Sequence, residues 1–179
     1  MVPDPGSERK LVSKLSLLYP STAWLLFDWG DTLMRVVPEF SGPMITWPYL
    51  TALPEAEETL ASLSTQYHLA LATNAEDSDE EQIRTALHQV SLESYLEEIF
   101  CTRRLGYRKP EPEYFRSIAN LLGVETNQIA MIGDSFTNDV IGAVGAGAQG
   151  IWLNTYSTEK RLGPGYFTVH SLGEIISFS

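Results

Sequence analysis

The sequence predicts an α/β fold in which helices cover a parallel β-sheet. Two observations predict it: short apolar runs alternate with amphipathic segments, and Pro, Gly or capping residues stand at several boundaries between them. The composition agrees, because 44% hydrophobic and 20% charged residues among 179 are ordinary for one folded domain. We expect that domain at residues 23–179. Residues 1–22, with three prolines and a short helix around residues 8–18, are expected to form an N-terminal appendage.

Strands are expected where short apolar runs lie between helical segments. Runs of this length are typical of strands that are buried in a parallel sheet. A loop rich in Pro, Gly and aromatic residues, at residues 34–53, separates the first two. The expected strands are residues 24–27, 68–73, 98–101, 129–133 and 150–153, and residues 166–179 add a last strand and helix.

Helices are indicated by apolar residues at helical spacing and by start and stop residues. The first begins at Pro54, and the second follows a capping box at residues 78–81. The third runs from Pro112 to Gly123, and a Gly- and Ala-rich helix follows Asn138. The inward positions of the first three are Ala56, Leu60, Leu63 and Tyr67; Ile83, Ala86, Leu87 and Val90; and Tyr114, Phe115, Ile118, Leu121 and Leu122.

Residues 145–150, Gly-Ala-Gly-Ala-Gln-Gly, spell a dinucleotide-binding fingerprint. That motif acts at a turn from a strand into a helix, where its glycines approach a pyrophosphate. Here the segment follows an expected helix and precedes an expected strand. It is therefore expected to end a helix and not to bind a dinucleotide.

Charge and cysteine usage exclude several classes of function. The 12 Lys and Arg against 23 Asp and Glu give a net charge of −11, which disfavours nucleic-acid and anionic-membrane partners. One cysteine, Cys101, cannot form an internal disulfide, and three scattered histidines offer no zinc spacing. The uncharged run at residues 15–27 is too short to span a bilayer and lacks a cleavage site. A soluble cytoplasmic protein is expected.

Polar residues follow four of the expected strands. Asp28 follows the first, Thr73 and Asn74 stand at the end of the second, Lys109 follows the third and Asp134 follows the fourth. Each of these alone is common in turns, helix caps or surface loops. Ligands of parallel α/β sheets bind beyond the carboxyl ends of the strands, so these residues are expected to meet. Carboxylates with a lysine and a hydroxyl are suited to Mg²⁺ and a phosphoryl group.

Four segments in this order resemble the motifs of the haloacid dehalogenase-like (HAD) hydrolase superfamily. They are residues 27–33 (Phe-Asp-Trp-Gly-Asp-Thr-Leu), residues 71–74 (Leu-Ala-Thr-Asn), Lys109-Pro110, and residues 133–139 (Gly-Asp-Ser-Phe-Thr-Asn-Asp). Their order and intervals fit the family over residues 23–153. The resemblance implies a three-layer, Rossmann-like fold with a parallel sheet in the order 5-4-1-2-3.

The resemblance also implies a Mg²⁺-dependent phosphatase that forms an aspartyl-phosphate. Asp28 would attack phosphorus, and water would hydrolyse the intermediate. Mg²⁺ would be bound by Asp28, by the carbonyl of Gly30 and by Asp134, with Asp139 supporting the metal or its waters.

The same resemblance assigns the substrate-binding residues. Thr73 and the backbone amides near it, with Asn74, would bind the phosphoryl oxygens, and Lys109 would neutralise the crowded negative charge. The expected substrate is a phosphorylated small molecule or a phosphoprotein. The sequence makes no prediction of the oligomeric state.

One position departs from the family. Most of its phosphatases carry a second Asp, the general acid and base, two residues after the nucleophile, and this chain has Gly30 there. Two roles are open for Asp31: it protonates the leaving group, or it caps a turn while solvent supplies the proton. Without a strong acid, acyl or aryl phosphates are the expected substrates. The alternative function is a catalytically weak protein that binds phosphorylated partners.

The intervals between motifs leave no room for a sizeable cap domain. Residues 34–67 number only 34 and must include one core helix, and residues 75–108 are filled by core elements. An open site is therefore expected, covered by the loop with Phe40, Met44 and Trp47. Trp29 and Trp47 are expected either to wall a leaving-group pocket or to pack in the core or an interface.

Overall fold

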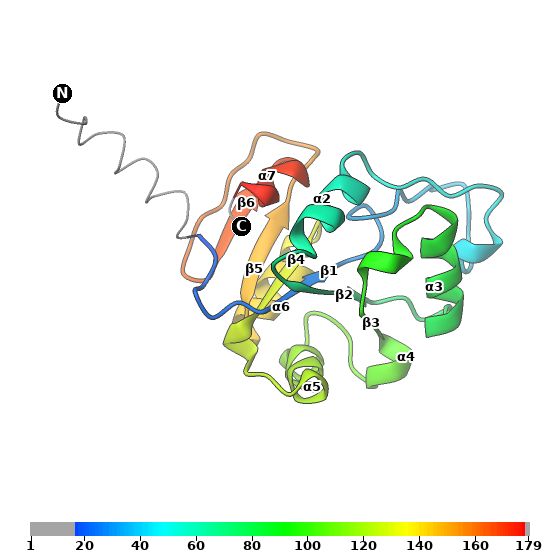
Figure 1. Cartoon of the computed structure of the whole chain (residues 1–179). Coiled ribbons are helices and arrows are strands. Elements are labelled where there is room, and N and C mark those ends of the chain that lie inside the picture. The colour runs from blue at the N-terminus through cyan, green and yellow to red at the C-terminus, as the bar shows by residue number, and fades with distance from the viewer. Residues whose placement is uncertain (1–16, 178–179) are drawn as a thin grey trace, which may run out of the picture.

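The computed structural model describes residues 17–177 and contains one sheet of six parallel strands, in the order β3-β2-β1-β4-β5-β6 (Figure 1). The expected α/β fold and the order of its first five strands are confirmed, and β6 extends the sheet beside β5. The strands are β1 (Trp24–Phe27), β2 (His68–Thr73), β3 (Glu98–Cys101), β4 (Ile129–Gly133), β5 (Gln149–Leu153) and β6 (Tyr166–Val169).

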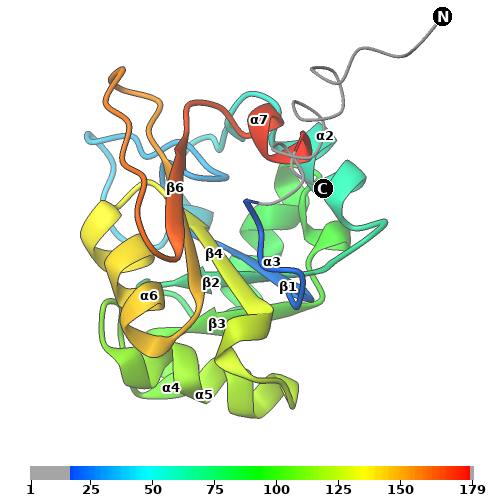
Figure 2. The same cartoon turned by 90° about the vertical axis from the view of Figure 1, so that its left-hand side faces the viewer.

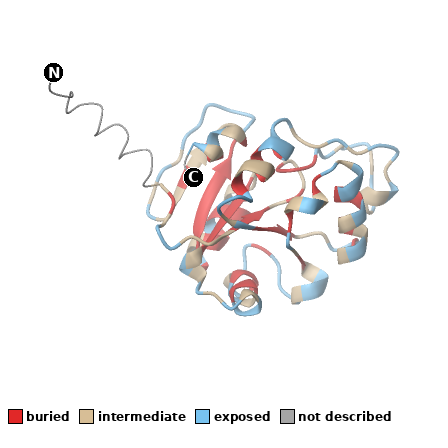
Figure 3. Cartoon of the chain, viewed as in Figure 1, coloured by how far each residue is buried: buried red, intermediate tan, exposed pale blue. Residues whose placement is uncertain are grey.

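Helices cover both faces of the sheet, which gives the three expected layers (Figures 1 and 2). The helices are α2 (Ala56–Leu63), α3 (Glu80–Gln89), α4 (Thr102–Leu105), α5 (Pro112–Leu122), α6 (Gly142–Ala146) and α7 (Gly173–Ile176), with single turns η1 (Met44–Thr46), η2 (Glu93–Tyr95) and η3 (Thr126–Gln128). Alternation along β1 shows the two faces: Leu25 and Phe27 pack with α2, α3 and α7, whereas Leu26 packs with α5 and α6. The strands are the most buried part of the fold (Figure 3).

The first helix is shorter than its sequence pattern predicts. It begins at Ala56, not at Pro54, because Glu55 takes a left-handed conformation with φ 64°. The Glu55 carboxylate accepts a hydrogen bond from the amide of Gly173 at 2.9 Å, which ties this turn to α7. The helix ends at Leu63, so Tyr67 lies beyond it, although its side chain still packs against the core.

The capping box of α3 lies one residue later than predicted. Asp79, not Ser78, is the N-cap: its carboxylate accepts from the amide of Gln82 at 2.9 Å, and the Gln82 side chain accepts from the amide of Asp79 at 3.0 Å. Ser78 is buried and donates instead to the Asp77 carboxylate. Both serine and aspartate cap helices well, so the local pattern does not decide between adjacent positions.

The Gly- and Ala-rich helix starts earlier than predicted. A π-helical turn, η4 (Phe136–Ile141), begins directly after Ser135 and leads into α6. Ser135 caps it by accepting from the amide of Asn138 at 3.3 Å. Gly147 ends α6 in a left-handed conformation with φ 91°, so the glycine-rich segment terminates a helix, as predicted.

The segment at residues 17–22 lies on the core. Leu18 is buried in the larger hydrophobic cluster, and the amide of Tyr19 donates to the side chain of Gln149 at 3.0 Å. Most of the helix expected around residues 8–18 falls outside the described residues, so the domain boundary stays a prediction. No helix among residues 17–177 is long and apolar enough to cross a membrane.

The loop at residues 34–53 is fastened to the core at both ends. The amide of Arg35 donates to Thr51 O at 2.9 Å, and the amide of Leu53 donates to Leu33 O at 2.8 Å. Within residues 17–177 no separate cap domain is present, and this loop, which contains η1, is the segment that extends over the sheet edge.

Candidate active site

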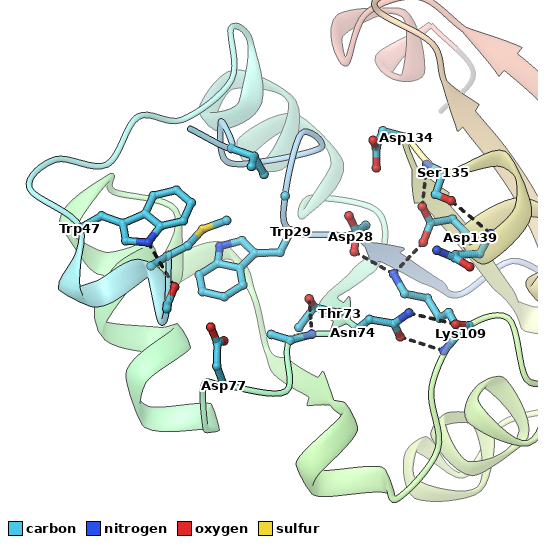
Figure 4. A pocket seen from close by; sticks show the side chains of 16 residues that line it. Asp28, Trp29, Trp47, Thr73, Asn74, Asp77, Lys109, Asp134, Ser135 and Asp139 are labelled. Atoms are coloured by element: carbon cyan, nitrogen blue, oxygen red, sulfur yellow. Dashed lines mark hydrogen bonds and ion pairs between the residues drawn. The ribbon is translucent and has the colours of Figure 1, made fainter. Parts of the chain in front are cut away.

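The carboxyl ends of the central strands bring the predicted residues together. Parallel pairing sets Phe27 of β1 beside Leu71 of β2 and Ile132 of β4, so the residues that follow them leave the sheet at one edge. Asp28, Thr73 and Asp134 all line one cavity of about 350 Å³ at this edge (Figure 4).

Lys109 lies at the centre of this arrangement, with a side chain that is only 2% exposed. Its Nζ atom lies 2.7 Å from Asp28 Oδ1 and 2.6 Å from Asp139 Oδ1 (Figure 4). It also lies 2.7 Å from Ala72 O, which accounts for its three protons. Burial by itself lowers the pKa of Lys109, but the two carboxylates outweigh burial and raise this pKa above its ordinary value. Lys109 therefore stays charged and links the loop after α4 to the residue that follows β1 and to η4.

Three carboxylates form an acidic cluster beside Lys109. One oxygen each of Asp28, Asp134 and Asp139 lies within 4.8 Å of the others. Burial, with the charges of Asp28 and Asp31, raises the pKa of Asp134 to about 6. Burial also raises the pKa of Asp139 to about 7, although Lys109 opposes that shift. One lysine thus undercompensates the cluster, and a divalent cation with oxygen ligands fits the remaining negative charge.

Asp139 is the most buried member of the cluster, at 1% exposure. One of its oxygens accepts from Lys109, and the other accepts from the amide of Ser135 at 3.0 Å. Its carboxylate lies against Gly133, where a Cβ atom would come within 2.1 Å of Asp139 Oδ2. Only glycine at position 133 lets the carboxylate approach β4 this closely.

Asp134 is held by two residues to which the sequence analysis assigned no role. Its amide donates to the hydroxyl of buried Thr32 at 3.1 Å, and its carbonyl accepts from the indole N–H of Trp152 at 2.8 Å. Thr32 belongs to the first motif, residues 27–33, so its position in the sequence indicated that it lies near the site. Trp152 lies inside β5, where nothing but its apolar character is visible in the sequence.

Thr73 and Asn74 differ in their orientation. The Thr73 hydroxyl accepts from the amide of Ala75 at 3.1 Å and lines the cavity, so its proton can be donated to a phosphoryl oxygen. The Asn74 side chain makes two hydrogen bonds to the backbone of Lys109, at 2.8 and 2.9 Å. Asn74 thereby positions Lys109, and its predicted direct contact with substrate stays a prediction.

Gly30 lines the cavity next to Asp28, but the space beside it is occupied. A Cβ atom at position 30 would lie 2.8 Å from Val36 Cγ2 and 3.8 Å from Met44 Cε. Val36 is β-branched and rotates with difficulty. The covering loop therefore fills the place where an acidic side chain at position 30 would begin.

Asp31 takes a left-handed conformation with φ 53° and lines a neighbouring cavity of about 400 Å³. Its Oδ1 atom accepts from the amide of Val36 at 3.0 Å, five residues along the chain. This contact favours the second of its two predicted roles, the cap of a turn. A part in proton transfer stays a prediction.

Trp29 and Trp47 both line the cavity that contains Asp28, together with Met44. In Figure 4 the two indoles lie on the side of Asp28 that faces away from Asp134 and Asp139. The cavity thus has a charged end, formed by carboxylates and a lysine, and an aromatic end that is formed largely by the covering loop.

Comparison with known proteins identifies relatives of this chain. The family model described as haloacid dehalogenase-like hydrolase matches residues 29–153. The chain is 27% identical to the human N-acylneuraminate-9-phosphatase over 107 residues, which are 59% of this chain and 42% of that protein. It is also 27% identical to the pyrimidine 5′-nucleotidase PynA of Streptococcus pneumoniae over 164 residues, 86% of this chain and 65% of the relative. The chain spans about half the length of the curated relatives that it matches.

Solved structures show the same fold. An uncharacterized protein from Listeria monocytogenes serotype 4b superposes with a TM-score of 0.75 at 25% identity, over 86% of this chain and 94% of that one. A HAD phosphatase from Thermococcus onnurineus superposes with a TM-score of 0.60 at 29% identity, over 70% of this chain and 57% of the other.

Proposed function

We propose that this chain, which belongs to the haloacid dehalogenase-like hydrolase family, is a phosphatase that uses Mg²⁺ and Asp28 to hydrolyse a phosphomonoester. The observation that carries the proposal is the position of Lys109, whose amine bridges Asp28 and Asp139 at 2.7 and 2.6 Å beside Asp134. The phosphatase activities of the relatives support the same reaction class.

A magnesium site is supported by the chemistry of the donors. Asp28, Asp134 and the carbonyl of Gly30 would hold the ion, and Asp139, which Lys109 and Ser135 orient, would act through waters. These are hard oxygen ligands, which Mg²⁺ prefers to nitrogen or sulfur. The bound ion would offset charge on the carboxylates and on the phosphoryl group.

The residues of the chain supply the covalent step. An oxygen of Asp28 attacks phosphorus, the bond from phosphorus to the leaving oxygen breaks, and an aspartyl-phosphate remains. Water then attacks that phosphorus, releases phosphate and restores the carboxylate. Lys109 fixes the orientation of Asp28 through Oδ1, and Thr73 donates its hydroxyl proton to a phosphoryl oxygen.

Proton delivery is the weak part of the machinery. Gly30 carries no acid, and the Asp31 carboxylate is already engaged with Val36 N, so we assign protonation of the leaving group to water. The Asp31→Asn variant tests this assignment. Turnover of an alkyl phosphate near the wild-type rate supports it, and a loss of a hundredfold or more returns the acid role to Asp31.

The test of the proposal is a panel of phosphomonoesters, from small molecules to phosphopeptides, assayed with Mg²⁺ and with EDTA. Mg²⁺-dependent release of phosphate by the wild type, and its loss in Asp28→Asn, support the phosphatase. The alternative, a protein that only binds phosphorylated partners, is motivated by Gly30. It is favoured if both proteins are inactive while the wild type still binds phosphate or a phosphopeptide.

A further inference from the structure

The aromatic end of the cavity is held by contacts within the covering loop. The indole N–H of Trp47 donates to Gly42 O at 3.1 Å, and the rings of Phe40 and Trp47 pack in an edge-to-face arrangement at 5.6 Å between centroids. Tyr49 supports Phe40 in turn, at 5.3 Å. The indole of Trp47 is therefore held from two sides. A ligand ring that packs on it would cost little conformational entropy of the protein.

Trp29 contributes a second aromatic surface and an unused hydrogen-bond donor. Its side chain is 3% exposed, and its indole N–H is buried without a hydrogen-bond partner in the described part of the chain. A buried donor of this kind is costly unless a ligand acceptor satisfies it. Trp29 directly follows Asp28, so this donor and the nucleophile belong to the same turn.

The charges around the cavity disfavour an acidic leaving group. Among the described residues that line it, Lys109 is the one cation, and its amine already contacts two carboxylates. Asp77 lines the aromatic end, and the neighbouring Glu76 pairs with Arg108 at 3.1 Å. A second negative group on the substrate would lie near the Asp77 carboxylate and would be repelled by it, and no unpaired cationic side chain among the described lining residues could offset that repulsion.

The absence of an acid at position 30 limits the leaving group in a second, independent way. Val36 fills the space beside Gly30, so no side chain there can donate a proton. A phenol, with a pKa of about 10, leaves as its anion far more readily than an alcohol, whose pKa is close to the 15.7 of water. Phenolate is thus a leaving group that needs little protonation.

We propose that this cavity takes the phosphate ester of a neutral phenol, with the aryl ring against Trp47 and Trp29. This inference rests on the proposed function and names its substrate class. Asp28 attacks phosphorus, the bond from phosphorus to the aryl oxygen breaks, and the electron pair leaves with the phenolate. The water that hydrolyses the aspartyl-phosphate releases one proton, and the phenolate takes up one, so the steps balance.

Four small substrates separate ring recognition from leaving-group strength. Phenyl phosphate has an aryl ring and a good leaving group, benzyl phosphate has the ring and a poor one, acetyl phosphate has a good leaving group without a ring, and cyclohexyl phosphate has neither. We expect kcat/KM to be highest for phenyl phosphate. A phosphotyrosine peptide with neutral flanks, compared with free phenyl phosphate, distinguishes a protein source of the aryl phosphate from a small molecule.

Two aromatic variants provide a matched pair. Trp47→Leu removes an aromatic residue that lines the cavity, and should lower the ratio of kcat/KM for phenyl phosphate to that for acetyl phosphate by about twofold to tenfold. Tyr107→Leu removes an exposed aromatic residue that neither lines the cavity nor takes part in the aromatic contacts that hold Trp47, and should leave the ratio unchanged. Equal ratios in the two variants would overturn the aryl site.

A third variant tests the leaving-group argument. Gly30→Asp combined with Val36→Ala places a carboxyl group beside Asp28 and removes the methyl group that blocks it. Relative to Val36→Ala alone, it should raise turnover of benzyl phosphate at least tenfold and change phenyl phosphate less, because acid catalysis contributes about 10²–10⁴-fold with poor leaving groups. Equal gains on both substrates contradict the argument.

Failure of the inference is distinguishable from failure of the proposed function. If cyclohexyl and acetyl phosphate are hydrolysed as efficiently as phenyl phosphate, and Asp28→Asn abolishes all activity, the phosphatase stands and the aryl site falls. If a folded wild-type protein hydrolyses none of these substrates but hydrolyses another member of the phosphomonoester panel, only the aryl site falls. If it hydrolyses no member of either set with Mg²⁺, both fall.

Discussion

Replacing Lys109 by methionine is the most direct test of how one buried ammonium group offsets the negative charge of the carboxylates in the site. The side chain is 2% exposed, and its amine makes three contacts of 2.6 to 2.7 Å, to Asp28, to Asp139 and to the carbonyl of Ala72. Methionine fills most of the same volume but leaves the buried carboxylate of Asp139, the partly buried carboxylate of Asp28 and a carbonyl without their donor.

The expected cost follows from that geometry. Removal of one partner from a buried ion pair costs about 3–5 kcal/mol, because the other charge is left uncompensated. A domain of this size is stable by about 5–15 kcal/mol, so Lys109→Met should lose a large part of its free energy of unfolding. Arg116→Met, which breaks the exposed ion pair with Glu113, serves as the control and should cost less than about 1 kcal/mol.

The assay is urea unfolding in EDTA near neutral pH, with circular dichroism as the signal that monitors unfolding. Addition of Asp139→Asn to Lys109→Met should recover part of the lost stability, since it removes the most buried of the unpaired charges. The loss should also shrink as the pH is lowered and the carboxylates become protonated. A cost for Lys109→Met no larger than that of Arg116→Met, or no recovery in the double variant, would refute the reasoning.

Three other outcomes are expected. In EDTA the free energy of unfolding of the wild type should fall as the pH rises from about 5 to about 8, because the raised pKa values of Asp134 (about 6) and Asp139 (about 7) keep protons in the folded state that the unfolded chain has already released. Urea titrations at several pH values measure this slope, and Mg²⁺ should diminish it. A free energy of unfolding that rises or stays constant with pH contradicts the expectation. Asp79→Ala should lower the free energy of unfolding by about 1 kcal/mol through loss of the α3 cap, and an unchanged urea midpoint argues against that cap. Gly133→Ala should reduce phosphatase activity at least tenfold, because the added Cβ atom would collide with Asp139. In the control Gly145→Ala the added Cβ atom meets nothing within 4 Å, so this variant should be as active as wild type. Equal rates for the two variants count against this role of Gly133.

The strands and the convergence of the site could be predicted because both follow from regular patterns. The buried run at β4, residues 129–133, is apolar throughout and leaves little choice of structure. Once the parallel order is known, residues such as Asp28 and Asp134 must leave the sheet at one edge. Burial of Lys109 between them then follows from charge.

Loop geometry could not be predicted in the same way. The direction of the Asn74 amide, which points to the Lys109 backbone, depends on the path of two loops that are 35 residues apart in the chain. Val36 blocks position 30 only because the loop at residues 34–53 returns to the core. These features carry no periodic signal, and they decide which groups face a ligand.

The position of Lys109 also bears on the order in which the protein matures. A centre built of carboxylates alone would repel itself until an ion arrived, and folding would wait for that ion. Here an internal ammonium group already joins β1 to η4. Under the proposed function, the polypeptide would consequently reach its final shape in an ion-poor environment and bind its cation afterwards, so that scarcity of the ion would lower activity without unfolding the protein.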